Sequence, residues 1–286
     1  MLTLLCISSL SFAIESQPKE QLIKNAAQGD IESQVDLGLN YCMGIGVKRD
    51  YKKAFKLLST AAEKDHSDAQ YNLGLLYFNG HGVKKNIPEA IKWYRMAAEQ
   101  GNSLAQFNLG VCYDTGEGVP RNEVEAATWY RKAAEKGHAS AQYNLAVCLD
   151  KGEGVAKNPV DAVRFYRQAA KQGDAMAQNN LAFCYVNGNG VLRNEVEATK
   201  WFRKAADQGC DVAQYNLGMS YYKGEGVEKN AIEAYAYFKL AGTTYKKAQK
   251  RGYLLKKEMT REQIDKAQRP TRELLEQINA NKFKSK

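Results

Sequence analysis

Ser220 and Lys223 stand three residues apart, a spacing that in serine enzymes acting on β-lactams places a lysine beside the nucleophile. The segment from Ser16 to Lys19 has the same S-x-x-K pattern. The chain has neither the Ser-Asp-Asn nor the Lys-Thr-Gly element that completes such active sites. Because matches of this length occur by chance and Ser220 falls within a helical pattern, we predict no catalytic residues.

The cysteines and histidines show no arrangement that would bind a metal ion. Cys112, Cys148 and Cys184 recur at equivalent helix positions, where stacked Cα atoms would lie about 10 Å apart, beyond the limit of about 7 Å for a disulfide. We expect these three thiols to be buried packing residues and Cys210, in a turn, to be accessible. The histidines fall in turns and loops: His66, His81 and His138. None is accompanied by a set of cysteines or carboxylates at ligand spacing, so the sequence predicts no metal site.

A Gly-x-Gly-Val element occurs six times, and its glycines could suggest a phosphate-binding loop. The elements begin at Gly44, Gly80, Gly116, Gly152, Gly188 and Gly224. They follow helical rather than strand patterns, and they lack the third glycine and the βαβ setting of a dinucleotide site. We therefore interpret them as connections between helices, and we predict no cofactor.

These glycines belong to a repeat that runs through most of the chain. The block Ala-Gln-Tyr-Asn-Leu-Gly at residues 69–74 returns with a fixed step at residues 105–110, 141–146, 177–182 and 213–218, and a looser copy occupies residues 33–38. A fixed period of this length is typical of small units stacked in an array rather than of one globular core.

Each repeat is predicted to contain two helices. Ala69, Leu73 and Tyr77 lie on one face of the first helix, and the Gly-x-Gly-Val element ends that helix. Asn86 is the expected N-cap of the second helix, and Glu89 completes a capping box whose carboxylate reaches back to the cap. The same pair recurs as Asn122 with Glu125, Asn158 with Asp161, Asn194 with Glu197, and Asn230 with Glu233.

Together these motifs resemble the Sel-one-like repeat (SLR), a relative of the tetratricopeptide repeat with a longer, glycine-bearing connection between its helices. The resemblance covers about residues 31–246. It implies an all-α fold, a right-handed superhelical α/α solenoid of six 36-residue repeats. The expected repeats are residues 31–66, 67–102, 103–138, 139–174, 175–210 and 211–246. Residues 14–30 would form a lead-in with a partial repeat helix, and residues 247–286 a basic helical C-terminal cap and tail in which Pro270 kinks or splits the last helix.

Members of this family are mostly protein-binding scaffolds, so the resemblance implies a non-enzymatic adaptor that binds a peptide segment or a partner helix. The predicted contact surface is the side of the first helices opposite Ala69 and Leu73, which lines the concave groove in tetratricopeptide-like solenoids. Its residues are Tyr71, Asn72, Leu75, Phe107, Asn108, Val111, Tyr143, Asn144, Val147, Asn180, Phe183, Tyr215, Asn216 and Met219. The asparagines could equally bond the adjacent repeat. An alternative is β-lactam hydrolysis or penicillin binding, as some family members have been labelled.

The positive charge of the chain gathers at its C-terminal end. Residues 239–286 hold 14 lysines and arginines against 5 acidic residues, whereas the rest of the chain balances at 27 against 27. Such a tail could associate with a membrane surface or a nucleic acid. Acidic residues interrupt the positive ones and few aromatic residues accompany them, so we instead expect a solvated face on a capping helix of a monomer.

The segment from Leu2 to Ala13 predicts the compartment of the protein. It is apolar, too short to span a membrane, and ends in small residues where a signal peptidase would cut. Residues 1–13 are therefore predicted to be a bacterial signal peptide, with a mature chain that begins near Ile14 and is periplasmic or secreted. No lysine or arginine precedes the apolar segment, and a cytoplasmic protein is the alternative.

Overall fold

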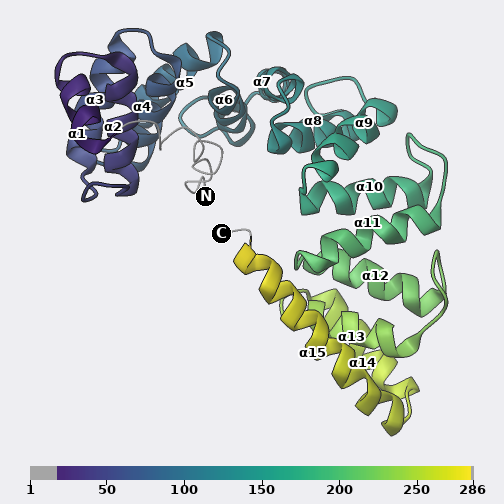
Figure 1. The fold of residues 1–286 in the computed structure, drawn as a ribbon. Helices are drawn as coiled ribbons and strands as arrows, with labels where there is room; N and C mark the ends of the chain where they lie inside the picture. The colour runs from purple at the N-terminus through teal and green to yellow at the C-terminus, as the bar shows by residue number, and fades with distance from the viewer. Residues whose placement is uncertain (1–17, 285–286) are drawn as a thin grey trace. The chain divides into compact units, whose positions relative to one another are not determined.

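The computed structural model describes residues 18–284, and this part of the chain is built from helices and turns without a strand (Figure 1). The predicted signal peptide lies outside the described residues. The helices are α1 (Lys19–Ala27), α2 (Ile31–Met43), α3 (Tyr51–Glu63), α4 (Ser67–Asn79), α5 (Ile87–Glu99), α6 (Ser103–Thr115), α7 (Glu123–Glu135), α8 (Ala139–Lys151), α9 (Pro159–Lys171), α10 (Ala175–Asn187), α11 (Glu195–Asp207), α12 (Asp211–Lys223), α13 (Ala231–Ala241), α14 (Lys246–Glu258) and α15 (Arg261–Lys284).

The helices belong to two compact units, the first ending at Ala141 and the second beginning at Gln142. Within the first unit α1 packs on α2, and three helix pairs follow, α2 with α3, α4 with α5 and α6 with α7, each packed on the next. Within the second unit α9 packs on α10, α10 pairs with α11, and α12 pairs with α13. Each of the six predicted repeats begins at the first residue of an even-numbered helix from α2 to α12. The predicted all-α repeat fold is confirmed.

The helix ends agree with the predicted signals except for one bond. The side chain of Asn86 accepts from the Glu89 N–H, as expected of an N-cap. The carboxylate of Glu89 was expected to reach back to the Asn86 backbone N–H, but that N–H donates to the Tyr77 carbonyl at 2.9 Å. The second helix is therefore tied to the first helix of its own repeat by its cap, and this tertiary bond replaces half of the predicted capping box. The N–H groups of Asn122, Asn158, Asn194 and Asn230 bond first-helix carbonyls in the same way.

Close packing of the two helices in a repeat depends on small residues that face an aromatic ring. Gly74 on α4 lies against the ring of Tyr94 on α5, and a Cβ atom at Gly74 would lie only 2.7 Å from that ring. Tyr94 is fully buried, and so are Ala90 and Ala97 on either side of it along α5. Gly110 faces Tyr130 and Gly218 faces Phe238 in the same way, so the core of these repeats is one ring set among methyl groups and a glycine.

Within each unit a buried glutamine joins a first helix to the helix pair before it. The Nε2 group of this glutamine donates to the carbonyl eight residues earlier, in pairs that include Gln70 with Ala62, Gln106 with Ala98, Gln178 with Ala170 and Gln214 with Ala206. Its Oε1 atom accepts from a second glutamine 30 residues later, at 2.8 Å, in the pairs Gln70 with Gln100, Gln142 with Gln172 and Gln178 with Gln208. We call these bonds the glutamine ladder.

The glutamine ladder has two gaps within the first unit. Gln34 and Gln106 also donate to the preceding repeat, but their Oε1 atoms are buried without a hydrogen-bond partner. At the position of the second glutamine these repeats have Lys64 and Lys136. An ammonium group on a longer side chain does not occupy the place of the glutamine amide, and the two acceptors remain unsatisfied.

The C-terminal helices do not form a single cap. Leu255 of α14 is buried in one cluster with Phe238 of α13, so α14 covers the end of the repeat array. One side of α15 is buried at Ala267 and Ile278, and the helix packs along α13 and reaches α11. Pro270 was expected to kink or split this helix, and α15 is not split, because it continues through Pro270 to Lys284. Met259 and Ile264 belong to the cluster around Phe238, so the start of α15 also covers the last repeat, and α15 extends beyond it to α11.

The cysteines of the described chain form no disulfide. Cys112, Cys148 and Cys184 are buried as predicted, with at most 9% of each side chain exposed. Cys210 was predicted to be the accessible thiol, but it is half-buried rather than exposed. Its Sγ lies 3.9 Å from the Met176 Sδ. It occupies the N-cap position of α12 without forming a side-chain cap bond.

Filling one gap in the glutamine ladder should stabilise the first unit. In Lys64→Gln, the new Nε2 group would donate to the buried Oε1 of Gln34, as Gln100 does to Gln70. We expect the free energy of unfolding to rise by about 0.5–1.5 kcal/mol, measured by urea denaturation. Lys64→Ala is the control, because it removes the same charge without adding a donor. Equal stability of the two variants would contradict the ladder.

Acid should weaken the first unit through His138. Its Nδ1 accepts from the Ala141 N–H, its ring stacks on Phe107 at 4.6 Å, and burial lowers its pKa below the ordinary value of 6.5. The unfolded chain then binds the proton more readily, so stability is lost as the pH falls below about 6.5 toward the folded-state pKa.

Asn102 occupies the place of His138 in the preceding repeat and caps its helix in the same way. In thermal unfolding between pH 7.5 and pH 5, His138→Asn should therefore lose less stability than the unaltered protein. His81→Asn removes a histidine that caps no helix and is the control. If both variants lost as much as the unaltered protein, His138 would not be the titrating group.

Candidate functional site

The predicted contact residues are less exposed than the helical pattern implied. The prediction that Tyr71 and Asn108 are exposed is wrong, because only 4% and 6% of their surfaces are accessible. A first helix inside a stack packs on its own second helix and on the preceding second helix, so both flanks of its outer side are covered. Phe183 is exposed, and the others are half-buried: Asn72, Leu75, Phe107, Val111, Tyr143, Asn144, Val147, Asn180, Tyr215, Asn216 and Met219.

The aromatic members of this set stabilise their own repeats. The ring of Phe107 lies 6.0 Å from that of Tyr130, and the rings of Tyr143 and Tyr166 are 6.1 Å apart. Tyr71 with Tyr94 and Tyr215 with Phe238 repeat this contact. Each ring therefore helps to hold a first helix against a second helix, and only its remaining edge is available to a ligand.

Hydrogen bonds inside the fold already engage several of the asparagines. The Nδ2 group of Asn180 donates to the Tyr166 hydroxyl of the preceding repeat at 3.3 Å. Asn216 donates to Asn179 at 3.0 Å, also in the preceding repeat, whereas Asn72 donates to a carbonyl of its own helix. The alternative that the asparagines bond adjacent repeats therefore holds for Asn180 and Asn216.

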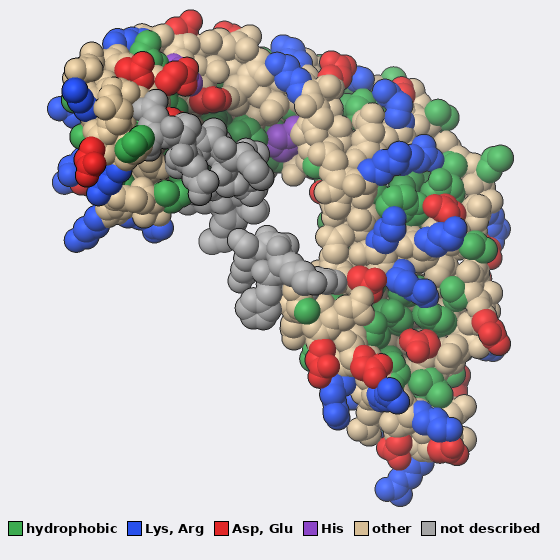
Figure 2. Space-filling view, in the orientation of Figure 1, with side chains coloured by type: hydrophobic (Ala, Val, Ile, Leu, Met, Phe, Trp, Pro, Cys, Tyr) green, Lys and Arg blue, Asp and Glu red, His purple; other side chains and the backbone are tan. Residues whose placement is uncertain are grey.

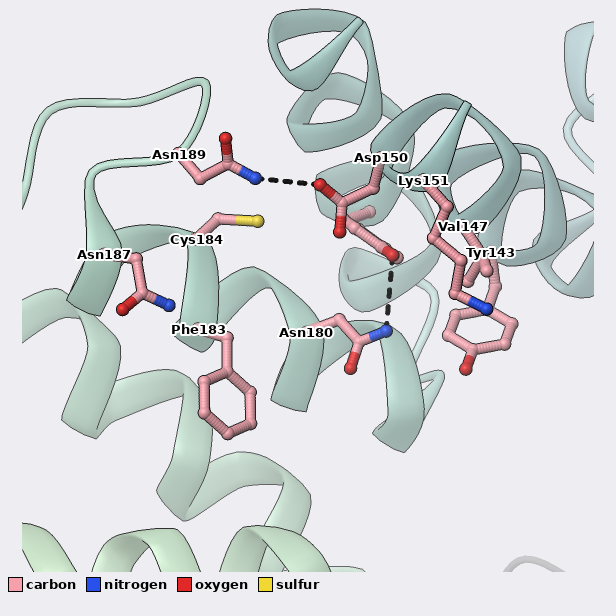
Figure 3. Close-up of a pocket in the computed structure, with 10 residues that line it drawn as sticks. Tyr143, Val147, Asp150, Lys151, Asn180, Phe183, Cys184, Asn187 and Asn189 are labelled. Carbon is pink, nitrogen blue, oxygen red and sulfur yellow. Dashed lines mark hydrogen bonds between the residues drawn. The ribbon is translucent and has the colours of Figure 1, made fainter. Parts of the chain in front are cut away.

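One pocket in the second unit brings four of the predicted residues together. It has a volume of about 370 Å³ and is open to solvent. Tyr143 and Val147 of α8 line one side, and Asn180 and Phe183 of α10 line the other (Figure 3). The remaining lining residues are Asp150, Lys151, Tyr166, Cys184, Asn187 and Asn189.

The pocket arises where the fifth repeat departs from the other repeats. The position that holds Tyr71, Phe107, Tyr143 or Tyr215 elsewhere is Asn179 here, and Asn179 is buried. A ring instead occurs four residues later, because Phe183 replaces the aliphatic residue of the other repeats. The rings of Phe183 and Phe202 form a T-shaped pair with centroids 5.4 Å apart, while 39% of Phe183 stays exposed. Moving the ring along α10 thus places an accessible aromatic face beside α8.

Both charges and amides line the pocket. Asp150 Oδ1 accepts from Asn189 Nδ2 at 2.8 Å, which joins the end of α8 to the Gly-x-Gly-Val connection after α10 (Figure 3). Lys151 is paired with Glu153 at 3.4 Å. Because an amide is neutral, the bond from Asn189 orients the Asp150 carboxylate without cancelling its charge.

The titratable groups around Asp150 favour their neutral forms. Burial, with a smaller contribution from the Asp150 charge, raises the pKa of the Cys184 thiol to about 11. Burial also raises the pKa of Tyr166, and a weaker effect of Asp150 acts in the same direction. At neutral pH the thiol and the phenol thus remain protonated, so neither is an activated nucleophile.

The S-x-x-K segment of α12 is not arranged for catalysis. Ser220 is buried, and Lys223 pairs with Glu225 at 3.3 Å rather than facing into a cavity. The second S-x-x-K match begins at Ser16, outside the described residues. Within residues 18–284, no cluster of three or more histidine, cysteine or acidic side chains could hold a metal ion. No helix of the described chain is both long and apolar enough to cross a membrane.

Sequence reasoning missed the polar half of the pocket, namely Asp150, Asn187 and Asn189. A signal was present, because the middle residue of the Gly-x-Gly-Val connection is Asn189 in the fifth repeat but Glu117, Glu153 or Glu225 in three of the others. The departures from the repeat consensus at residues 183 and 189 both line this one cavity. Comparing the repeats with one another would therefore have located the site better than their shared pattern.

Comparisons with known proteins agree with the fold. The model of the Sel1 repeat matches residues 31–66, 67–102, 103–138, 139–174, 175–210 and 211–243. A Sel1 repeat protein from Oxalobacter formigenes is 33% identical with a TM-score of 0.65, over 78% of this chain and 95% of that one. A protective antigen of uropathogenic Escherichia coli strains, described as displaying an SLR fold, is 32% identical with a TM-score of 0.63 over 91% of this chain. This chain spans 64% of the length of the antigen. None of the curated proteins compared matches significantly.

Proposed function

Because the chain belongs to the Sel1 repeat family, whose members are commonly protein-interaction scaffolds, we propose that it is a non-enzymatic adaptor that binds a peptide segment of another protein in the pocket between α8 and α10. The pocket carries the proposal, since it combines accessible aromatic edges with amide groups. Aromatic and aliphatic surfaces take the side chains of an extended segment, and amides bond its backbone.

The size of the pocket suits part of a peptide rather than a whole protein surface. A volume of about 370 Å³ lies in the range of small-ligand sites, enough for one or two side chains. Further contacts would come from half-buried residues on neighbouring first helices, such as Met219 on α12. An adaptor of this kind needs no activated nucleophile, in keeping with the protonated Cys184 and Tyr166.

Peptide binding can be tested by selecting ligands from a random phage-displayed peptide library against the whole chain. The affinity of a selected peptide is then measured by fluorescence anisotropy. Phe183→Ala should weaken binding about tenfold or more, because an exposed aromatic contact is lost with little effect on the fold. Val111→Ala alters the same helix position in the third repeat and should leave the affinity unchanged.

Two results would contradict the proposal. A library that yields no binding peptide would argue against the adaptor function, and equal weakening by Phe183→Ala and Val111→Ala would exclude this pocket as the site. Tyr143→Ala is a less suitable variant, because Tyr143 is more buried than Phe183 and its removal would disturb the contact with Tyr166.

The enzyme alternative makes a separate prediction. Since Lys223 pairs with Glu225, we expect the purified protein to hydrolyse a chromogenic cephalosporin no faster than buffer does, and Ser220→Ala to leave that rate unchanged. The measurement is the change in absorbance with time at high protein concentration. Hydrolysis that Ser220→Ala abolishes would establish the serine as a nucleophile and overturn the adaptor proposal.

A further inference from the structure

Asp150 is the one acidic side chain among the residues that line the pocket between α8 and α10. Its carboxylate accepts a hydrogen bond from the neutral amide of Asn189. The ion pairs found in residues 18–284 do not include Asp150. The carboxylate is therefore held in place with its negative charge uncompensated.

The lysine next to Asp150 does not cancel this charge. Lys151 is paired with Glu153, and both partners are about half exposed, with 58% and 46% of their side chains accessible. That ion pair is neutral as a whole. A cation from outside the pocket would consequently be attracted to Asp150 and not repelled by a free ammonium group.

The walls of the pocket suit the alkyl stem of a basic side chain. Phe183 is exposed and Tyr143 is half-buried, and either ring can contact methylene groups or a guanidinium plane. Asp150 and Asn180 project into the space between the helices from opposite sides (Figure 3). An amide such as that of Asn187 has an oxygen that can accept a further hydrogen bond.

We propose that the pocket binds the side chain of a lysine or arginine in the partner's peptide segment, with Asp150 as its counter-ion and Phe183 and Tyr143 around its stem. The inference rests on the proposed function, because it names the chemistry of the segment that the same pocket takes. It accounts for an acidic residue in a pocket that is otherwise apolar or neutral apart from the paired Lys151.

The third repeat supplies a matched control for Asp150. Asp114 occupies the same position on α6, is exposed, and accepts a hydrogen bond from the Tyr130 hydroxyl at 3.2 Å. It does not line the pocket. Asp114→Asn therefore removes the same charge from the same place in a repeat without altering the proposed site.

The test uses three capped pentapeptides of alanine with lysine, norleucine or glutamate at the centre. Each is titrated into the isotope-labelled full chain, and binding is followed through the NMR amide signals of α8 and α10. The lysine peptide should shift these signals saturably, and the norleucine peptide should bind about fivefold more weakly or worse, as expected for a partly exposed charge pair. Asp150→Asn should weaken lysine binding to a similar degree, whereas Asp114→Asn should not.

Equal binding of the norleucine and lysine peptides, or equal effects of Asp150→Asn and Asp114→Asn, would overturn the inference. So would the absence of any saturable shift with the lysine peptide. The proposed function fails separately, when the peptide library yields no ligand. Library peptides that depend on Phe183 but contain no basic residue would leave the adaptor function standing and refute only the role of Asp150.

Discussion

The architecture depends on a buried glutamine amide that must be satisfied on both of its sides. Gln70 has no exposed surface. Burying an amide without hydrogen bonds would destabilise the repeat. Its Nε2 bonds the repeat before it, and its Oε1 accepts from Gln100 at the end of the following second helix. The first bond joins neighbouring repeats and the second joins the two helices of one repeat, so the amide links the pairing of two helices to their stacking on the preceding repeat.

The sequence predicted the parts of the fold that recur. Spacing located the first residue of every repeat, the asparagine caps and the glycine ends, because each of these is a local backbone requirement. The spacing did not predict the features that depend on contacts between helices. The backbone N–H of Asn86 bonds Tyr77 instead of the capping carboxylate, and Tyr71 is buried by a neighbouring helix. A single helix pattern carries no information on what packs against its second side.

Only part of the candidate site was predicted from the sequence. Tyr143, Val147, Asn180 and Phe183 were found because they lie on the outer side of a first helix, and the pocket brings them together. Asp150 and Asn189 come from the end of one helix and from the connection after another, and nothing in a periodic pattern links such positions. The face of the second unit seen in Figure 2 mixes both signs of charge with hydrophobic side chains.

The position of α15 bears on how a protein of this kind changes its length during evolution. Tandem duplication adds or removes whole repeats, and each new copy must find partners that resemble those of its parent. Because α15 lies along α13 and α11, it is matched to the particular side chains of the last two repeats. Duplication upstream of α11 leaves that match intact, whereas a copy added after α13 would separate the tail from one of its partners. The contacts of α15 therefore favour the addition of repeats at positions before α11.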